Sequence, residues 1–293
     1  MKILITGSNG LLGNDCKQVL QREHDVVACN SQEMDITDEE AIRETLNNNK
    51  PDIVINCAAY TKVDACESEK ELAWKINVDG TGKIALGASE YGSKLIHIST
   101  DYVFDGRKSL PEPYVEDDEQ CPVSYYGKIK LEGEKAVRKI VANHMIIRTA
   151  WVYGMHGHNF LKTMLKLALN DPERQIKVVN DQYGSPTWSY QLAQQIGKLI
   201  LLNGQGTFHA TSEGYCTWYD VAKYFLEKMG LRHRLIPCST DEYPTPAIRP
   251  QNSILENKRL KELGGNLMTH WQDGIDLFVE RFRNTLINEC VLR

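Results

Sequence analysis

The sequence predicts a doubly wound parallel α/β sheet with a smaller, partly interleaved domain in its C-terminal half. Two observations support this fold class. Short apolar runs alternate with helical stretches through the first half of the chain, and Gly7, Gly10 and Gly13 follow the first of these runs directly. Strands that alternate with helices form right-handed βαβ units and a parallel sheet, and apolar runs without polar alternation suit strands that are covered on both faces.

Each predicted element in the first half has a local signal. Asp38 stands where an N-cap precedes a helical pattern, and Pro51 precedes an apolar run that is typical of a buried strand. The predicted strands span residues 2–6, 25–29, 52–57, 94–99 and 144–148, and the predicted helices span residues 38–48, 67–91 and 125–142.

The glycine triplet predicts a dinucleotide site. Glycine lets the backbone turn sharply and approach a pyrophosphate, and the helix that follows offers unpaired N–H groups at its positive end. Three glycines alone are a common pattern, but here they lie between a predicted strand and a predicted helix. Residues 1–150 are therefore predicted to form a dinucleotide-binding domain.

After residue 150 the alternation weakens, and short helices, loops and aromatic residues follow. Strands near residues 175–180 and 206–210 are expected to return to the sheet, while residues 151–293 are expected to form mainly a substrate-binding domain. Ligands of open α/β sheets bind in the crevice at the carboxyl ends of the strands. We therefore expect the substrate to lie there, between the two halves.

The composition argues against several kinds of partner. A net charge of −5 disfavours nucleic acid and anionic membranes. No apolar run approaches the ~20 residues of a membrane helix, and no secretory signal precedes the first strand. The eight cysteines form no Cys-x-x-Cys pair, and the histidines show no metal-ligand spacing. We expect a cytoplasmic protein with reduced thiols and no metal site.

Tyr126 and Lys130 are the candidate catalytic pair. Their spacing puts them on one face of a helix, and Thr100 lies at the end of a predicted strand, where the crevice is expected. A free tyrosine has a pKa of about 10, and an ammonium at about 4 Å is worth roughly 4 kcal/mol at an effective dielectric of ~20, or about three pKa units. Lys130 is therefore expected to lower the pKa of Tyr126 toward ~7, where a proton donor works best.

The same spacing occurs at Tyr219/Lys223 and at Tyr224/Lys228. These two pairs are predicted to be ordinary helix surface. Only Tyr126 and Lys130 follow a Ser-Thr strand end inside the nucleotide-binding half, so the catalytic interpretation rests on position rather than on spacing.

Together, the glycine motif, Thr100 and Tyr126-x-x-x-Lys130 resemble the extended short-chain dehydrogenase/reductase family, whose nucleotide domain has the Rossmann fold. Longer strings resemble one branch of that family, the dTDP-4-dehydrorhamnose reductases, and they run in order along nearly the whole chain. These strings are residues 99–106, 148–154, 159–164, 181–187 and 245–253.

This resemblance implies hydride transfer from a reduced nicotinamide to the C4 ketone of dTDP-4-dehydro-6-deoxy-L-mannose, which gives dTDP-L-rhamnose. It implies that Tyr126 donates the proton, that Lys130 holds the nicotinamide ribose, and that Thr100 polarises the carbonyl. The implied cofactor contacts are Gly7, Asn9, Gly10, Leu11, Leu12 and Gly13 at the pyrophosphate, Asp35 and Ile36 at the adenine, Cys57, Ala58, Ala59, Tyr60 and Thr61 along the ribose and nicotinamide, and Ser99, Tyr126 and Lys130 beside them.

The end of the second strand bears on the choice of cofactor. An acid there would grip a ribose 2′-hydroxyl and repel a 2′-phosphate. The strand ends Cys29-Asn30-Ser31, with no acid before Glu33. We therefore expect NADPH to be preferred and NADH to be usable.

The substrate contacts implied by position have structural alternatives. Trp151 is expected to pack on the sugar or thymine, or else in a core between the domains. Arg249 is expected to bind a diphosphate, which arginine reads well, or else to brace its loop through an ion pair. The full set is Thr100, Asp101, Tyr102, Trp151, Asn159, Arg249 and Asn252.

Two other functions stay open at this point. One is a non-catalytic NADP-binding regulatory subunit of the same fold, and the other is a different sugar-nucleotide epimerase or dehydratase. The sequence leaves the nucleobase undecided. The resemblance suggests a homodimer, for which the sequence offers no legible interface.

Overall fold

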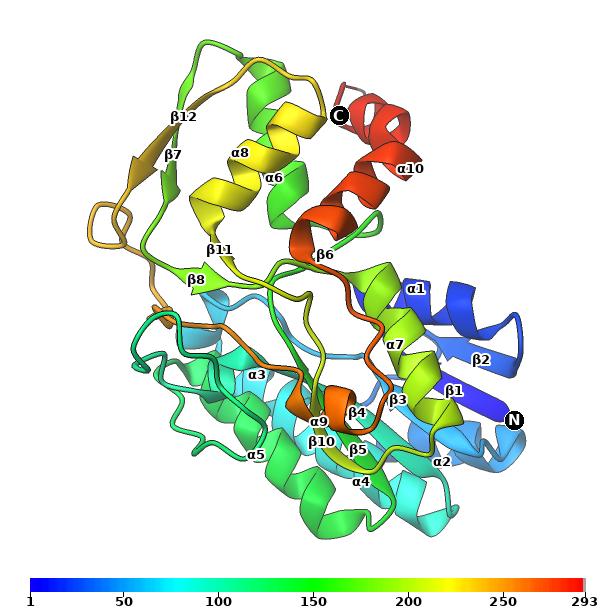
Figure 1. The fold of residues 1–293 in the computed structure, drawn as a ribbon. Coiled ribbons are helices and arrows are strands. Elements are labelled where there is room, and N and C mark those ends of the chain that lie inside the picture. Colours follow the sequence, from blue (N-terminus) through cyan, green and yellow to red (C-terminus); the bar gives the residue numbers. More distant parts are fainter. Residues whose placement is uncertain (292–293) are drawn as a thin grey trace.

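A computed structural model describes residues 1–291 and contains a central sheet of six parallel strands (Figure 1). The strand order is β10-β5-β4-β3-β1-β2. This sheet confirms the predicted fold class. The strands are β1 (Lys2–Thr6), β2 (Asp25–Cys29), β3 (Ile53–Asn56), β4 (Lys94–Thr100), β5 (His144–Thr149) and β10 (Gly206–His209).

Helices cover both faces of the sheet, and the side chains of β1 show how. Ile3 and Ile5 pack in one core with α1 (Leu11–Leu20) and α7 (Ser189–Leu201). Leu4 points to the other face and packs in a second core with α2 (Glu39–Asn49), α4 (Thr81–Glu90) and α5 (Tyr125–Ile140). Because both faces are buried, the strands read as continuous apolar runs.

The predicted helix over residues 67–91 is wrong in detail, because the structure divides it. A 3₁₀ turn η1 (Ala65–Glu67) precedes α3 (Lys70–Trp74), a π-helical turn η2 (Lys75–Gly80) follows, and then α4 begins. The π turn buries Asn77, whose amide accepts from the Tyr60 N–H at 2.8 Å and donates to the Tyr60 carbonyl at 2.9 Å. The irregular turn therefore fixes the loop that follows β3.

Of the two strands expected to return to the sheet, one does so. Residues 206–209 pair in parallel with β5 as β10, as expected. The expectation for residues 175–180 is wrong: β7 (Gln175–Val179) pairs with β12 (Arg234–Cys238) in a separate two-stranded sheet. Exposed and buried residues alternate along β7, which suits a ribbon with one face in water rather than a doubly covered sheet.

The rest of the C-terminal half forms its own core, above the sheet in Figure 1. It includes α6 (Phe160–Asn170), α8 (Trp218–Lys228) and α10 (Trp271–Val291). Because α7 and β10 come from beyond residue 150 but pack with the sheet, the two halves are interleaved. The shorter elements are η3 (Asp101–Val103), β6 (Val152–Tyr153), β8 (Tyr183–Gly184), β9 (Thr187–Trp188), β11 (Cys216–Thr217) and α9 (Lys258–Glu262).

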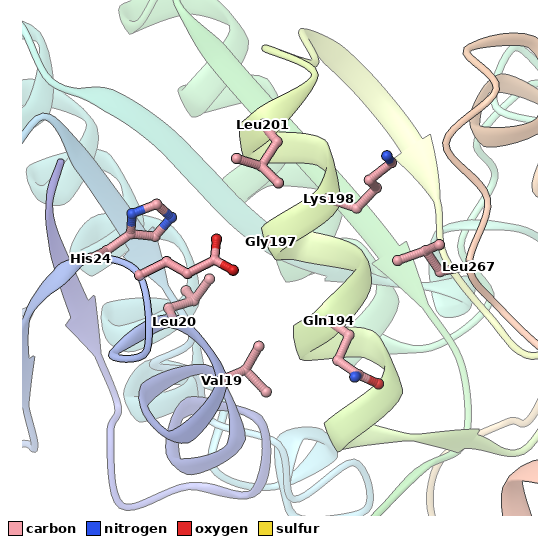
Figure 2. A pocket seen from close by; sticks show the side chains of 9 residues that line it. Val19, Leu20, His24, Gln194, Gly197, Lys198, Leu201 and Leu267 are labelled. Carbon is pink, nitrogen blue, oxygen red and sulfur yellow. The ribbon is translucent and has the colours of Figure 1, made fainter.

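A mostly apolar pocket of about 180 Å³ lies between α1 and α7, and Figure 2 shows Leu20 and Leu201 on its two sides. None of the predicted site residues lines it. Within residues 1–291, no helix has both the length and the apolar character needed to cross a membrane.

Candidate active site

The glycine loop after β1 is packed so closely that side chains are excluded from it. Gly7 has a φ of +64°, and a Cβ there would lie 2.8 Å from the backbone of Ala58. A Cβ on Gly13 would lie 2.3 Å from the Gly7 carbonyl oxygen. The turn therefore lies directly against the chain that leaves β3, and only glycine fits at these two positions.

The N-terminus of α1 lies beside this turn. Gly10 occupies the N-cap, and no side chain caps the helix. The first N–H groups of the helix are thus left to a ligand or to water, and the helix dipole favours an anion there. The tight turn and the uncapped helix fit the pyrophosphate of a dinucleotide.

The chain after β3 is held by buried polar contacts. The Thr6 hydroxyl donates to the Asn56 amide oxygen at 2.6 Å and accepts from the Ala58 N–H at 3.1 Å. Cys57 contacts the Cys16 thiol of α1. Residues Cys57 to Tyr60 are partly exposed along this edge, as cofactor contacts require. At the predicted adenine end, Asp35 is exposed, whereas Ile36 is buried in the core.

The start of α5 brings the candidate catalytic residues to the end of β4. Ser124 caps the helix by accepting from the Gly127 N–H at 3.1 Å, and a Cβ on Gly127 would lie 2.1 Å from the Tyr102 carbonyl oxygen. This close approach buries Tyr126, which is 8% exposed, and its phenol hydrogen-bonds the Thr100 hydroxyl. The Tyr102 ring meets the Tyr126 ring edge-on, with centroids 5.5 Å apart.

One helical turn later, Lys130 is 2% exposed and its ammonium donates to the Ile98 carbonyl of β4 at 2.7 Å. Both members of the motif therefore turn toward the end of β4. Burial lowers the pKa of Lys130 to about 8, while the charge of Glu134 opposes that fall.

The predicted lowering of the Tyr126 pKa by Lys130 is wrong. Burial raises the pKa of Tyr126 above its ordinary value, and the carboxylate of Asp101 raises it further. Burial also raises the pKa of Asp101 itself to about 6. The sequence argument counted the attraction of one ammonium but not the cost of taking the phenolate out of water. At neutral pH, Tyr126 is thus a protonated phenol, which is the form that can donate.

Two predicted substrate residues are engaged by the backbone instead. Asn159 caps α6 by accepting from the Lys162 N–H at 3.2 Å, and it donates to the Gly154 carbonyl at 2.8 Å. Asn252 donates to the Lys108 and Glu112 carbonyls at 3.3 and 2.8 Å and accepts from the Ile254 N–H at 3.0 Å. Their amides have structural partners, so we remove both from the proposed substrate contacts.

Arg249 forms the ion pair that was its structural alternative. Its two terminal nitrogens each lie 2.9 Å from a carboxylate oxygen of Asp64, which also accepts from the Ala247 N–H at 3.2 Å. The hydrogen bond from Arg249 holds the pKa of Asp64 below its usual range. This pair joins the loop after β3 to the proline-rich loop of the C-terminal half.

Trp151 follows β5 with a φ of +48° and stacks on Trp218, with ring centroids 3.6 Å apart. A Cβ on Gly184 would lie 2.5 Å from its indole ring. The indole is thus packed within the C-terminal half, although it stays partly exposed.

Sequence reasoning missed three residues that hold the site together, namely Asp64, Asn77 and Glu134. Glu134 had a usable signal, because it follows Lys130 by four residues and so lies on the same helix face. Asp64 and Asn77 had none, since their partners are distant in sequence or in the backbone.

Comparison with known proteins places the chain in a family. A sequence profile of the RmlD substrate binding domain matches residues 1–284. Spore coat polysaccharide biosynthesis protein SpsK of Bacillus subtilis is 39% identical over 280 residues, which cover 95% of this chain and 97% of that protein.

Two solved structures are similar over their whole length. A dTDP-4-dehydrorhamnose reductase from Clostridium acetobutylicum has a TM-score of 0.92 and 42% identity, with 97% of this chain and 100% of that chain covered. The dTDP-4-dehydrorhamnose reductase from Bacillus anthracis, solved in complex with NADP, has a TM-score of 0.92 and 37% identity, with 96% and 99% covered. The chain therefore belongs to the RmlD substrate binding domain family.

Proposed function

We propose that this protein is a dTDP-4-dehydrorhamnose reductase that reduces the C4 ketone of dTDP-4-dehydro-6-deoxy-L-mannose to dTDP-L-rhamnose with NADPH. The observation that carries the proposal is the protonated phenol of Tyr126, hydrogen-bonded to Thr100 at the strand ends that also bear the glycine loop. The reductases from C. acetobutylicum and B. anthracis support the substrate, and the NADP complex of the second supports the cofactor.

A bound NADPH supplies the hydride. When the carbonyl carbon accepts it, the carbonyl oxygen becomes an alkoxide, and Tyr126 gives that oxygen its proton. Thr100 orients the phenol through the hydrogen bond between them and donates to the same oxygen. Lys130, fixed on the Ile98 carbonyl, binds the hydroxyls of the nicotinamide ribose. One hydride and one proton convert the ketone to the alcohol.

The buried environment of Tyr126 suits the reductive direction. A proton donor must carry its proton at the working pH, and the raised pKa ensures this. In this proposal Asp101 and Tyr102 line the substrate site, Trp151 packs against the sugar nucleotide, and Arg249 contacts its diphosphate.

Cofactor preference depends on the turn after β2. The Glu33 carboxylate accepts from the Asn30 N–H at 2.8 Å and thereby stands at the end of this strand. Its charge weakens the preference for a 2′-phosphate without abolishing it. We expect Glu33→Gln to raise the ratio of kcat/KM for NADPH over NADH severalfold, and Glu23→Gln, on another loop, to leave the ratio unchanged.

A turnover assay tests the function directly. NADPH oxidation is followed at 340 nm with dTDP- and UDP-linked 4-keto-6-deoxy sugars, and the assay is repeated with NADH. We expect turnover of the dTDP-linked 4-keto sugar and a higher kcat/KM with NADPH. Cofactor binding without turnover would favour the regulatory subunit, and isomerised or dehydrated product without net NADPH oxidation would favour an epimerase or dehydratase. Both results would refute the reductase.

The homodimer and the cytoplasmic location stay predictions. Light scattering tests the first, with a mass twice that of one chain as the expected result. Localisation of the protein in fractionated cells tests the second.

A further inference from the structure

A fully buried carboxylate lies one helical turn beyond Lys130. Glu134 is 0% exposed and so is its partner Arg148 on β5. The Glu134 oxygens accept from the Ser99 hydroxyl at 2.5 Å, from Arg148 at 2.9 and 3.0 Å, and from Arg138 at 2.6 Å. These bonds tie α5 to the ends of β4 and β5, directly beside the candidate catalytic residues.

Glu134 keeps its charge although it is buried. Burial alone opposes ionisation, but the hydrogen bonds and charge of Arg148, with those of Ser99 and Arg138, hold the pKa of Glu134 below its ordinary value. Arg148 is fixed in turn, because it donates to the Glu116 carbonyl at 3.2 Å. The carboxylate is therefore a permanent negative charge with a fixed position.

Lys130 is the other buried ion in this region. The groups that act on its ammonium are Glu134 on the same helix, Cys57 after β3, and His97 on β4. Burial lowers the pKa of His97 well below its ordinary value, so this ring is neutral and adds no charge. Glu134 is the first of the two groups that favour the ammonium form of Lys130 against burial.

We propose that Glu134 is a positioning residue for Lys130: its buried carboxylate, fixed by Arg148 and Ser99, keeps the Lys130 side chain charged and docked on β4. This inference rests on the proposed role of Lys130 in holding the nicotinamide ribose. A simple bracing ion pair between α5 and β5 is the competing explanation. The two differ because bracing depends on both partners equally, whereas positioning of Lys130 depends on the carboxylate.

The experiment measures the dissociation constant of NADPH by its fluorescence between pH 6 and 9.5. The wild-type protein is expected to lose affinity above about pH 8, where Lys130 loses its proton. An opposite charge nearby shifts a pKa by about one unit or more, so Glu134→Gln is expected to move the midpoint down by about one unit. At pH 9 its Kd is then about tenfold above the wild-type value, and at pH 6 the two agree.

Arg148→Gln is the matched control, because it breaks the same ion pair in the same buried place but leaves the carboxylate. It is expected to lower the melting temperature and to keep the wild-type midpoint. If Glu134→Gln does not fold, the double variant Glu134→Gln/Arg148→Met removes both charges of the pair and is expected to show the same downward shift. Glu134→Asp, which restores the charge, is expected to recover most of the wild-type profile.

The outcomes separate this inference from the function on which it rests. Lys130→Met is expected to bind NADPH weakly at every pH, with no midpoint. Wild-type affinity in Lys130→Met would refute the role of Lys130 and, with it, this inference. Weak binding in Lys130→Met together with a wild-type midpoint in the folded Glu134 variants would refute the inference alone, as would equal shifts in the Glu134 and Arg148 variants.

Discussion

Two helices carry the same tyrosine–lysine spacing in opposite surroundings. On α5, Tyr126 is buried and hydrogen-bonds Thr100, and Lys130 donates to a strand carbonyl. On α8, the side chain of Lys228 is 43% exposed and lies 5.1 Å from the centroid of the Tyr224 ring. Spacing brings the two side chains of each pair to one helix face, but the neighbouring elements decide what they do.

The surface pair is satisfied by a single carboxylate on α10. Asp276 accepts from the Tyr224 hydroxyl at 2.9 Å and from the Lys228 ammonium at 2.8 Å. The hydrogen bond to Asp276 raises the pKa of Lys228, whereas burial lowers the pKa of Lys130 to about 8. The same residue type in the same motif therefore titrates in opposite directions, which is a measurable contrast.

The largest expected effect distinguishes the two tyrosines by turnover. Tyr126→Phe removes the proposed proton donor and is expected to lower kcat on the order of 10²-fold or more, with the NADPH dissociation constant little changed. Tyr224→Phe is the matched control and is expected to retain the wild-type kcat. A kcat within a few-fold of wild type for Tyr126→Phe would end its assignment as proton donor.

A second prediction contrasts the lysines by the pH dependence of stability. The pKa of Lys130 is about 8 in the folded protein against an ordinary value of 10.5, so the unfolded chain binds more protons between these values. The free energy of unfolding therefore rises with pH in this window, by about 1.5 kcal/mol from pH 8 to 9.5 through this group. Urea unfolding of Lys130→Met measures this as the change in its difference from wild type.

Lys228→Met is the control for that measurement. The pKa of Lys228 is raised rather than lowered, so its contribution is complete below its unfolded pKa and is lost only at higher pH. Its difference from wild type should stay flat from pH 8 to 9.5. Equal slopes for the two variants would show that Lys130 titrates like a surface lysine.

The smallest expected effect concerns the partners of the two phenols. Thr100→Val removes the hydroxyl that bonds Tyr126 and is expected to lower kcat about fivefold, the equivalent of about 1 kcal/mol for one hydrogen bond. Asp276→Asn changes the partner of Tyr224 and is expected to leave kcat unchanged. If Thr100→Val has the wild-type kcat, Thr100 neither orients the phenol nor polarises the carbonyl.

Most of the nucleotide-binding half could be predicted because its strands are short apolar runs separated by helical patterns. The strands around Ile5, Ile55 and Ile96 lie where these runs predicted them. The break within residues 67–91 was missed because a π turn leaves the local composition helical. The pairing of β7 with β12 was missed because it depends on a strand almost 60 residues further along the chain.

The site was predictable to a similar degree, and its failures have physical causes. The residues at strand ends, such as Thr100, could be placed because topology gathers those ends together. An asparagine, however, caps a helix as readily as it binds a ligand, so Asn159 and Asn252 were misassigned. The pKa of Tyr126 was misjudged because burial and Asp101 depend on folding, which a spacing of four residues does not encode.

The ion pair between Asp64 and Arg249 has a consequence for traffic through the site. Its guanidinium serves one oxyanion at a time through both terminal nitrogens, and Asp64 holds both. A diphosphate that arrives at Arg249 must therefore displace Asp64, and departure of the product lets the carboxylate return. Asp64 is in this sense a resident rival of the substrate, so Asp64→Asn should slow product release by leaving the arginine without its alternative.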